Sequence, residues 1–584
     1  MHLMTKEADE TDSDTSDKTM KNLTVDDVLS ITGQFGWSQK IYFVCLSFLQ
    51  IYVAFHMLLS VFTGLEPSFV CHVVGSDIKG GHNETLVNHC VDNSPSKCIR
   101  VEYTSQYKSF ATEWHLICSE KYKVALVQSV WMGGVMSGAL LLGGMADRLG
   151  RLRTLMGALL GTIAFEGFSA FSPSYLIMLV LRFFGGMSCA IVILVSFVLS
   201  QELVGSEWRS FCGICLGMSF AVGIAVFSAL AAVVSTWRIL TFVCSVSGIV
   251  FLLLPCYLPE SPRWLASVGR AEEAKEVLEG IAKLNGTLKN LPSHWEVSVT
   301  AGKGKKNKTP GLSMLLSHSY VTLLTLVLIF SWFVNSATYY GLTMAASDLG
   351  GDVYMSTALN GLVEVPAGII AMSIIDKLGR RATLCGFMFV GGIACLCIQF
   401  IPQRFVMVCT GLALCGKLGI SASFSACYIH SGEIFPTAIR NAGMGLVSVA
   451  ARVGGMLAPF ILMLGDVIPN LQFSVLGLLT LMAAFLNLKL PETQGHPMPD
   501  TVADILALRT SSTKMKDKSS QNYKYNKLED DENQGEETVV FAKGETEERH
   551  LKASPSSTSS SSYPQGVTRE DQVPLIEAED HCPS

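Results

Sequence analysis

The sequence predicts an all-α membrane protein with twelve transmembrane helices in two pseudo-symmetric six-helix halves. Three observations predict this class: 49% of the 584 residues are hydrophobic and only 16% are charged, long apolar runs recur, and polar motifs repeat between the halves. A helix needs about 20 apolar residues to cross roughly 30 Å of hydrocarbon. The expected spans are 41–63, 124–146, 154–172, 175–201, 211–234, 239–258, 320–342, 353–375, 383–401, 404–430, 441–464 and 472–490.

The short loops that carry Lys and Arg all fall on one side of this arrangement. Arg151 lies between the second and third spans, Lys305 between the sixth and seventh, and Lys377 between the eighth and ninth. Basic loops stay in the cytosol, so we expect a multi-pass plasma-membrane protein with both termini cytosolic. The N-terminus lacks a signal peptide, so the first span is expected to stay as an anchor. The expected regions are a cytosolic N-terminal segment 1–40, an N-terminal half 41–258 with an extracellular loop 65–120, a cytosolic linker 259–319, a C-terminal half 320–490, and a mostly disordered cytosolic tail 491–584.

The extracellular loop contains four cysteines, Cys71, Cys90, Cys98 and Cys118. Cysteines oxidise on the outside of the cell, so we expect two disulfides; three pairings are possible and the sequence does not choose among them. Asn83 begins a glycosylation sequon in the same loop.

Acidic and basic residues recur at matched helix ends, about 230 residues apart. Parallel six-helix halves are a known transporter architecture, with the substrate near the midplane between them. We expect the repeated charges to form a cytosolic gate whose ion pairs separate when the cavity opens inward; the alternative is that they only anchor the topology. The candidate gate residues are Asp147, Arg148, Arg151, Glu202, Arg209, Glu260 and Arg263 in the first half, and Asp376, Arg380, Arg381, Glu433 and Arg440 in the second.

Charged residues within the spans are candidates for substrate contact, because a charge in mid-membrane normally faces protein or a wet cavity. Glu364, Lys417 and Arg452 lie near the middle of their spans. The alternative is a permanent structural bridge between Glu364 and Arg452 or Lys417. Arg182 is either a fourth contact or a residue that reaches the headgroups, and we assign Glu166 a structural role.

Three rings in the seventh span, Trp332, Tyr339 and Tyr340, are further candidates. Trp332 and Tyr339 are seven residues apart and share a helix face. Rings that border a cavity could stack on an organic cation. The alternatives are ordinary aromatic packing or an interfacial belt.

The repeated motifs resemble the signature of the major facilitator superfamily over about residues 35–495, although Leu152 and Met372 depart from it. Within that superfamily the chain is similar to the organic cation, anion and zwitterion transporters of solute carrier family 22. The Cys-rich loop, Glu260-Ser261-Pro262-Arg263-Trp264-Leu265 and Glu433-Ile434-Phe435-Pro436-Thr437-Ala438-Ile439-Arg440-Asn441 carry this resemblance. Tyr339-Tyr340-Gly341-Leu342 with Asp348-Leu349-Gly350-Gly351 most resembles the branch of member 15 or a near paralogue.

The resemblance implies a major facilitator fold and transport of small organic ions by alternating access. Anion and carnitine-type members tend to have Arg where Arg452 stands, whereas cation transporters tend to have Asp. Arg452 would hold a carboxylate and Glu364 an ammonium, which favours a zwitterion such as carnitine or a betaine over a simple organic cation.

No nucleotide-binding loop, zinc spacing or nucleophile triad is convincing in the sequence. We therefore expect no enzyme activity, cofactor, metal or nucleic-acid partner. The expected partners are the lipid bilayer, a small organic ion or zwitterion as substrate, and Na⁺ or H⁺ as a candidate coupling ion. Transport of zwitterions or of organic cations is the favoured function. An organic anion transporter, a sugar porter and a non-transporting receptor with the same fold stay open as alternatives.

Overall fold

The computed structural model describes most of the predicted membrane region, and all of the residues that it describes belong to one compact unit, 1–513. Cys90 and nearly all of the expected tail 491–584 lie outside the residues that the structure describes. The described residues are 21–65, 68–74, 83–87, 98, 100–104, 107–292, 294–298, 315, 318–345, 352–402, 404–436, 439–495, 499 and 504–505.

Each of the twelve expected spans coincides with a helix or with two helices in line. Within the described residues, ten spans are long and apolar enough to cross a membrane, and α7 and α19 occupy the other two. The first half contains α2 (Trp37–Met57) with α3 (Leu59–Thr63), α5 (Tyr122–Leu142), α7 (Arg151–Ser169), α8 (Tyr175–Leu203), α9 (Arg209–Val233), and α10 (Trp237–Ser247) continued by the 3-10 helix η5 (Gly248–Cys256). The second half contains α13 (Ser319–Met344), α14 (Val353–Leu362) with α15 (Glu364–Leu378), α16 (Arg380–Gln399), α17 (Val406–Ile434), α18 (Arg440–Leu462) and α19 (Leu471–Asn487). The predicted fold class is confirmed.

Glycines allow helices of one half to pack at close range. A Cβ atom on Gly134 of α5 would lie 2.0 Å from the carbonyl oxygen of Phe183 in α8, and one on Gly138 would lie 2.3 Å from that of Met187. Such contacts suit membrane helices, which associate through close packing rather than through the hydrophobic effect.

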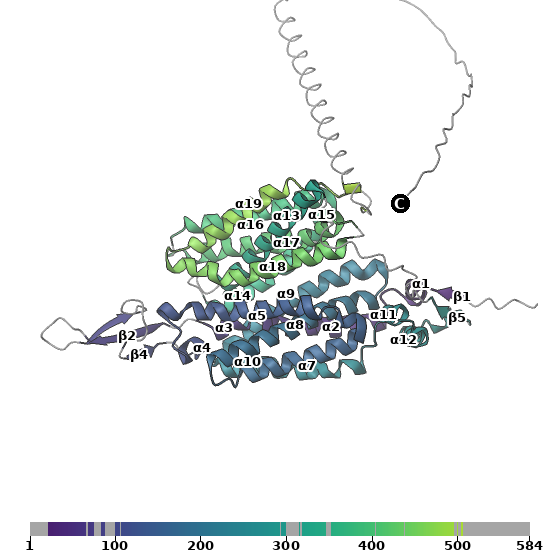
Figure 1. Ribbon diagram of the computed structural model, residues 1–584, viewed down its shortest axis with the longest axis horizontal. Helices are drawn as coiled ribbons and strands as arrows, with labels where there is room; N and C mark the ends of the chain where they lie inside the picture. Colours follow the sequence, from purple (N-terminus) through teal and green to yellow (C-terminus); the bar gives the residue numbers. More distant parts are fainter. Residues whose placement is uncertain are drawn as a thin grey trace, which may run out of the picture. The chain divides into compact units, whose positions relative to one another are not determined.

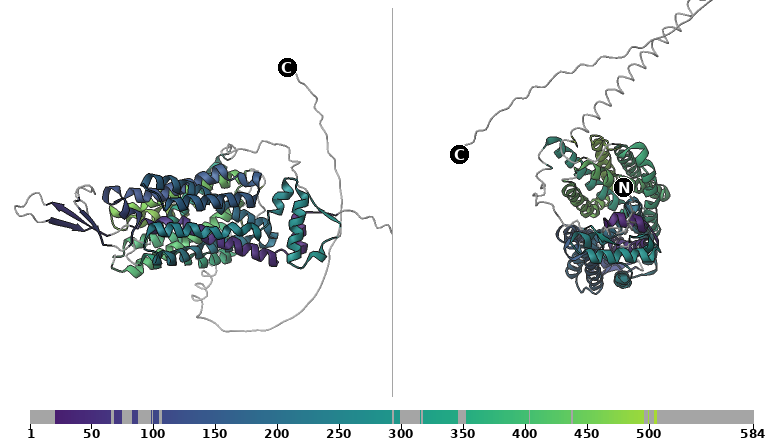
Figure 2. Two further views of the ribbon diagram at one scale, coloured as in Figure 1. Left: turned by 90° about the horizontal axis from the view of Figure 1, so that it is seen from below. Right: turned by 90° about the vertical axis from the view of Figure 1, so that its right-hand side faces the viewer.

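Figure 1 shows different small elements at the two ends of the helix bundle. One end, here called the sheet end, carries the antiparallel strands β2 (Phe69–Val74), β3 (Asn83–Val87) and β4 (Arg100–Tyr103), in the order β3-β2-β4. The opposite end, the motif end, carries α1 (Val25–Thr32), α11 (Pro262–Ser267), α12 (Ala271–Leu284), and the parallel pair of β1 (Lys21–Leu23) and β5 (Trp295–Val297). Figure 2 shows the same separation from below.

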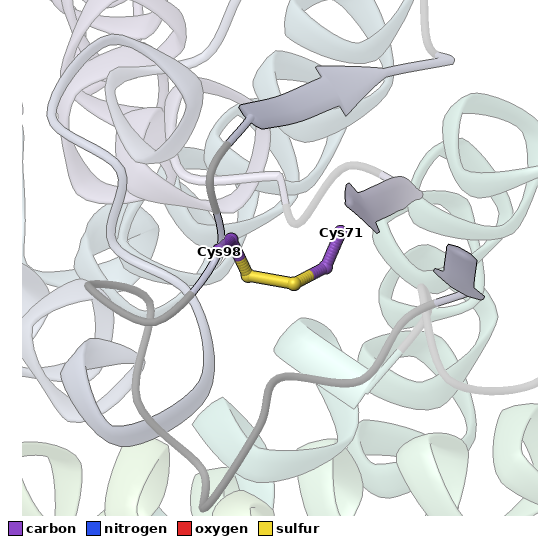
Figure 3. The surroundings of a disulfide bond; sticks show 2 residues. All are labelled: Cys71 and Cys98. Atoms are coloured by element: carbon purple, nitrogen blue, oxygen red, sulfur yellow. A yellow bond between two sulfur atoms is a disulfide. The ribbon is translucent and has the colours of Figure 1, made fainter. Parts of the chain in front are cut away.

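A disulfide joins Cys71 of β2 to Cys98 (Figure 3), and their Cα atoms are 5.3 Å apart. Cys118 is also disulfide-bonded. The predicted sequon residue Asn83 begins β3, which pairs with β2.

The two halves meet through α5 against α18 and α9 against α14. Ser129 of α5 donates a hydrogen bond to the carbonyl oxygen of Met456 in α18 at 2.7 Å, and the Ser228 hydroxyl donates to the carbonyl oxygen of Tyr354. Because α5 and α14 begin at the sheet end while α9 and α18 finish there, these contacts lie toward the sheet end. At the motif end, the hydrogen bonds and ion pairs between described residues stay within one half.

Candidate functional site

Two arginines occupy equivalent places in the two halves at the motif end. Arg151 pairs with Glu202 at 3.0 Å and with Asp147 at 2.9 Å. In the second half, Arg380 pairs with Glu433 at 3.2 Å and with Asp376 at 3.0 Å. The sequence repeat is therefore also a repeat of contacts. In each half, the arginine at the start of one membrane helix binds an acid four residues before it and an acid of the next membrane helix.

Two glutamates cap the helices that begin with these arginines. Glu260 accepts a hydrogen bond from the backbone N–H of Arg151 at 2.8 Å, and Glu492 accepts one from that of Arg380 at 2.8 Å. A carboxylate is favourable at a helix N-terminus, where N–H groups lack partners. Burial alone would raise the pKa of Glu492, but backbone hydrogen bonds, with Arg380 the largest contributor, lower it overall.

Glycines precede both capped helices, and each has two reasons to be glycine. Gly150 has φ of 103° and Gly379 has φ of 93°, a region that other residues rarely enter. A Cβ atom would also come within 2.6 Å of Glu260 and 2.7 Å of Glu492, respectively. A larger residue at either glycine would both strain the turn and collide with the glutamate that caps the helix.

Two predicted gate arginines have a partner that the sequence did not reveal. Arg209 donates to Asp26 of α1 at 2.7 Å, and Arg263 donates to the same carboxylate at 2.9 Å. A hydrogen bond from Arg263 holds the pKa of Asp26 below its ordinary value of 3.8. Asp26 precedes the first membrane span, and nothing in the repeat pattern points to it.

The remaining gate candidates make local contacts or are exposed. Arg381 donates to the carbonyl oxygen of Leu490 at 3.3 Å, Arg440 donates to that of Phe435 at 3.2 Å, and Arg148 is exposed. We expected the gate pairs to separate when the cavity opens at this end. The described pairs instead join residues of the same half, so the halves can part without breaking them.

Two of the predicted mid-membrane charges pair with each other. Nζ of Lys417 lies 3.0 Å from Oε1 of Glu364, and Lys417 is 0% exposed while Glu364 is 12% exposed. The Tyr339 hydroxyl donates to the same carboxylate at 2.7 Å, and Lys417 also reaches the Thr343 hydroxyl at 2.6 Å. This is one of the two bridges considered from the sequence, and it already satisfies Glu364.

Arg452 of α18 differs from the other mid-membrane charges. Within the described residues its Nε is buried without a hydrogen-bond partner, and no carboxylate lies within ion-pair distance. Its electrostatic neighbours include Tyr340 and Tyr428 in its own half and Cys189 of α8 in the other. Arg452 therefore carries a charge that the described protein does not neutralise by contact.

Aromatic side chains from α13 and α17 form a continuous group beside Arg452. Trp332 and Tyr428 have ring centroids 4.2 Å apart, and Phe424 lies 5.6 Å from Tyr428 and 6.2 Å from Tyr339. Trp332 is buried and donates to the Ser431 hydroxyl, whereas Tyr428 is 45% exposed. Phe424 and Tyr428 were missed from the sequence, because a four-residue spacing of rings in an apolar helix also describes ordinary packing.

Arg182 lies in a buried ion pair of the first half. Its Nη1 is 2.7 Å from Glu166 Oε2, the two side chains are almost inaccessible, and the Trp131 indole donates to the same carboxylate. This geometry favours a structural role for Arg182, as predicted for Glu166.

The chain matches known transporters over most of its length. The sequence profile of the family described as "Sugar (and other) transporter" matches residues 80–501. A "Solute carrier family 22 member 15-like" protein of Xenopus laevis is 38% identical over 492 residues, which cover 82% of this chain and 96% of that protein. The chain belongs to solute carrier family 22. The human "Organic cation/carnitine transporter 2" is 32% identical over 404 residues, 69% of this chain and 72% of that protein.

Among solved structures, the inward-open conformation of the xylose transporter XylE from E. coli superposes with a TM-score of 0.54 at 16% identity, covering 82% of this chain and 99% of that one. At this identity the likeness shows the fold alone, and it confirms the major facilitator fold. Membership of the family makes the chain a membrane transporter of the organic-ion type and not an enzyme. Within the described residues no group of His, Cys, Asp or Glu is placed to hold a metal ion.

Proposed function

We propose that the chain carries small zwitterions across the plasma membrane by alternating access, with the substrate carboxylate bound by Arg452. The observation that carries this proposal is the buried, unpartnered Nε of Arg452. Glu166, Arg182, Glu364 and Lys417 each have an opposite charge in contact. A buried N–H donor without a partner is unfavourable, and a guanidinium binds a carboxylate through two parallel hydrogen bonds.

The cationic end of the substrate would rest on aromatic rings and not on Glu364. Glu364 already accepts from Tyr339 and pairs with Lys417, so an ammonium would have to displace a buried lysine. Tyr428 is 45% exposed and lies in the ring group beside Arg452. A ring face attracts a quaternary ammonium by about 0.5–2 kcal/mol, which suits carnitine-like and betaine-like compounds.

An organic anion is the second candidate substrate, because an unpaired arginine attracts any carboxylate. The ring group distinguishes the two classes: it offers an anion no charge complementarity, whereas it completes a site for a zwitterion. A simple organic cation would meet repulsion from Arg452. A neutral sugar would leave the arginine unpaired.

The different elements at the two ends of the bundle support a proposed orientation in the membrane. We assign the sheet end to the outside, where a second disulfide involving Cys90 and Cys118 and glycosylation of Asn83 would form, and the motif end and both termini to the cytosol. The motif-end charges would then keep each half rigid while the halves rock against each other. Na⁺ and H⁺ stay candidates for the coupling ion.

The test is uptake by cells that express the full chain, with carnitine, glycine betaine, tetraethylammonium, an organic anion such as p-aminohippurate, and glucose as probes. We expect saturable uptake of the zwitterions that falls at least about tenfold in Arg452→Ala, since one bidentate charged contact is lost. Arg404→Ala, which removes an exposed arginine from a loop at the sheet end, is the matched control. Surface-expressed Arg452→Ala that transports zwitterions like the wild type would exclude this site, and selective uptake of a simple cation, an anion or glucose would exclude the substrate class.

A further inference from the structure

A chamber of about 620 Å³ lies between the halves at the sheet end. Its walls come from α3 and α5 of the first half and from α13, α14, α18 and α19 of the second. Arg452 is not among the described residues that line it. The volume lies within the range of about 300–1,000 Å³ that is typical of small-molecule sites, so the chamber is large enough for a second ligand.

An ion pair joins the two halves at this chamber. Nζ of Lys121, which precedes α5, lies 2.7 Å from Oδ1 of Asp466, which follows α18, and both residues line the chamber. The side chains are 29% and 48% exposed. A pair that is this accessible to solvent contributes about 0–1 kcal/mol, so a ligand that offers both charges can replace it at little cost.

Buried amides supply neutral polar groups in the same walls. Gln472 of α19 is buried and lines the chamber, and its Oε1 has no hydrogen-bond partner among the described residues. Gln128 of α5 is also buried, accepts from the Ser60 hydroxyl and donates to the carbonyl oxygen of Met57. An unsatisfied buried acceptor is unfavourable, and a ligand with a hydroxyl or N–H group would satisfy it.

Met57 also connects this wall to the central site. The Tyr340 hydroxyl contacts Sδ of Met57 at 3.4 Å across the two halves. Tyr340 packs against Gly455, which lies about one helical turn beyond Arg452. The Tyr340–Met57 contact therefore links a residue bonded to the chamber wall with a ring that packs on the helix of Arg452.

We propose that the chamber is a second binding site for zwitterions, in which the carboxylate binds Lys121 and the cationic group binds Asp466. The proposal rests on the proposed function and deepens it. A zwitterion replaces both partners of the Lys121–Asp466 pair at once, so the bridge between the halves opens without leaving either charge unpaired. A simple cation or anion replaces only one partner. The chamber would therefore select the same substrate class as the proposed central site at Arg452.

The experiment counts bound ligand on the purified full chain in lipid nanodiscs, with radiolabelled carnitine as the zwitterion and choline as the matched cation. We expect about two carnitine molecules per chain in the wild type and about one in Arg452→Ala and in Lys121→Met. In the Arg452→Ala background, adding Lys121→Met weakens the remaining site at least about tenfold, the effect of losing one charge-assisted hydrogen bond. Choline binding does not fall in Lys121→Met, because a cation at Asp466 makes no contact that needs Lys121.

The control variant is Lys123→Met, which removes a neighbouring lysine that pairs with Glu120 of the same half. One carnitine per chain in the wild type, lost completely in Arg452→Ala and unaffected by Lys121→Met, would overturn the second site and leave the proposed function standing. Carnitine binding that Arg452→Ala does not change would overturn the proposed function. Equal losses in Lys121→Met and Lys123→Met would show a general surface-charge effect and overturn the assignment to the chamber.

Discussion

Lys417 of α17 and Glu364 of α15 form an ion pair inside the second half, with Nζ 3.0 Å from Oε1. Removing one partner of a buried pair leaves the other charge uncompensated, at a cost of about 3–5 kcal/mol. We predict that Lys417→Met strongly lowers the thermal stability of the detergent-purified chain. The double variant Lys417→Met with Glu364→Gln should recover most of that loss.

Thermal melting followed by tryptophan fluorescence measures both variants. A Lys417→Met protein as stable as the wild type would contradict a structural pair. A double variant that is stable but no longer binds zwitterions would support the initial expectation that Glu364 contacts the substrate.

Arg182 and Glu166 should behave as part of the scaffold of the first half. Among the described residues, Arg182→Met leaves the fully buried Glu166 carboxylate with the Trp131 indole as its one side-chain partner. We predict a loss of surface expression and thermal stability, comparable to that of Lys417→Met, with an unchanged KM for carnitine in the molecules that fold. A normally stable Arg182→Met with a raised KM would mean that Arg182 contacts substrate.

Gly361 of α14 controls how closely the halves approach at the sheet end. A Cβ atom there would lie 2.6 Å from Cβ of Ile224 and 2.8 Å from the carbonyl oxygen of Ala221 in α9. Overpacking costs about 1–3 kcal/mol, so Gly361→Ala should shift the population toward states that are open at this end. We predict that a cysteine at Ser60, which lines the chamber, reacts at least about fivefold faster with an impermeant maleimide.

Gly368→Ala is the matched control, because a Cβ atom at Gly368 of α15 meets nothing within 4 Å. Equal labelling rates in the two alanine variants would contradict the role of Gly361.

Asp26 should hold α1 against the motif end over a wide pH range. Because Arg263 lowers its pKa from 3.8, the ionised form is favoured by the folded contact. The stabilisation is present at neutral pH, persists below pH 5, and is lost only as the pH falls through the lowered pKa. Asp26→Asn should therefore loosen α1 at every pH above that point.

Hydrogen exchange of the Val28 and Leu29 amides at pH 5 and 7 measures this attachment. Protection should be the same at the two pH values in the wild type after correction for intrinsic rates, and lower in Asp26→Asn. Glu276→Gln, in the exposed face of α12, is the control. Loss of protection between pH 7 and 5 in the wild type would show that another group is responsible.

The sequence predicted the helices well, and it predicted that acids and arginines at matched helix ends would form ion pairs, but whether those pairs act as a gate stays a prediction. Twenty apolar residues in a row have few alternatives to a membrane helix. Arg151 and Arg380 reach the acids four residues before them because side chains four apart on a helix are neighbours, whereas Glu202 and Glu433 come from the next helix. It was harder to predict which charged residues far apart in the sequence would pair. Lys121 and Asp466 are far apart in sequence and lie in ordinary loop contexts, and Asp26 is one of many acids in the N-terminal segment. Which lysine or arginine would pair with Glu364 depended on helix rotation, which the sequence does not encode locally.

The pairing of β1 with β5 has a consequence for biosynthesis. Lys21–Leu23 leaves the ribosome before any membrane helix, but its partner Trp295–Val297 follows all six helices of the first half. At about 5–20 residues per second, the first strand waits on the order of 14–55 seconds for the second. The strand pair and the Asp26–Arg263 contact can therefore form only after all six helices of the first half have been translated. A ribosome that stops before residue 295 releases a chain whose N-terminal strand has no partner in β5.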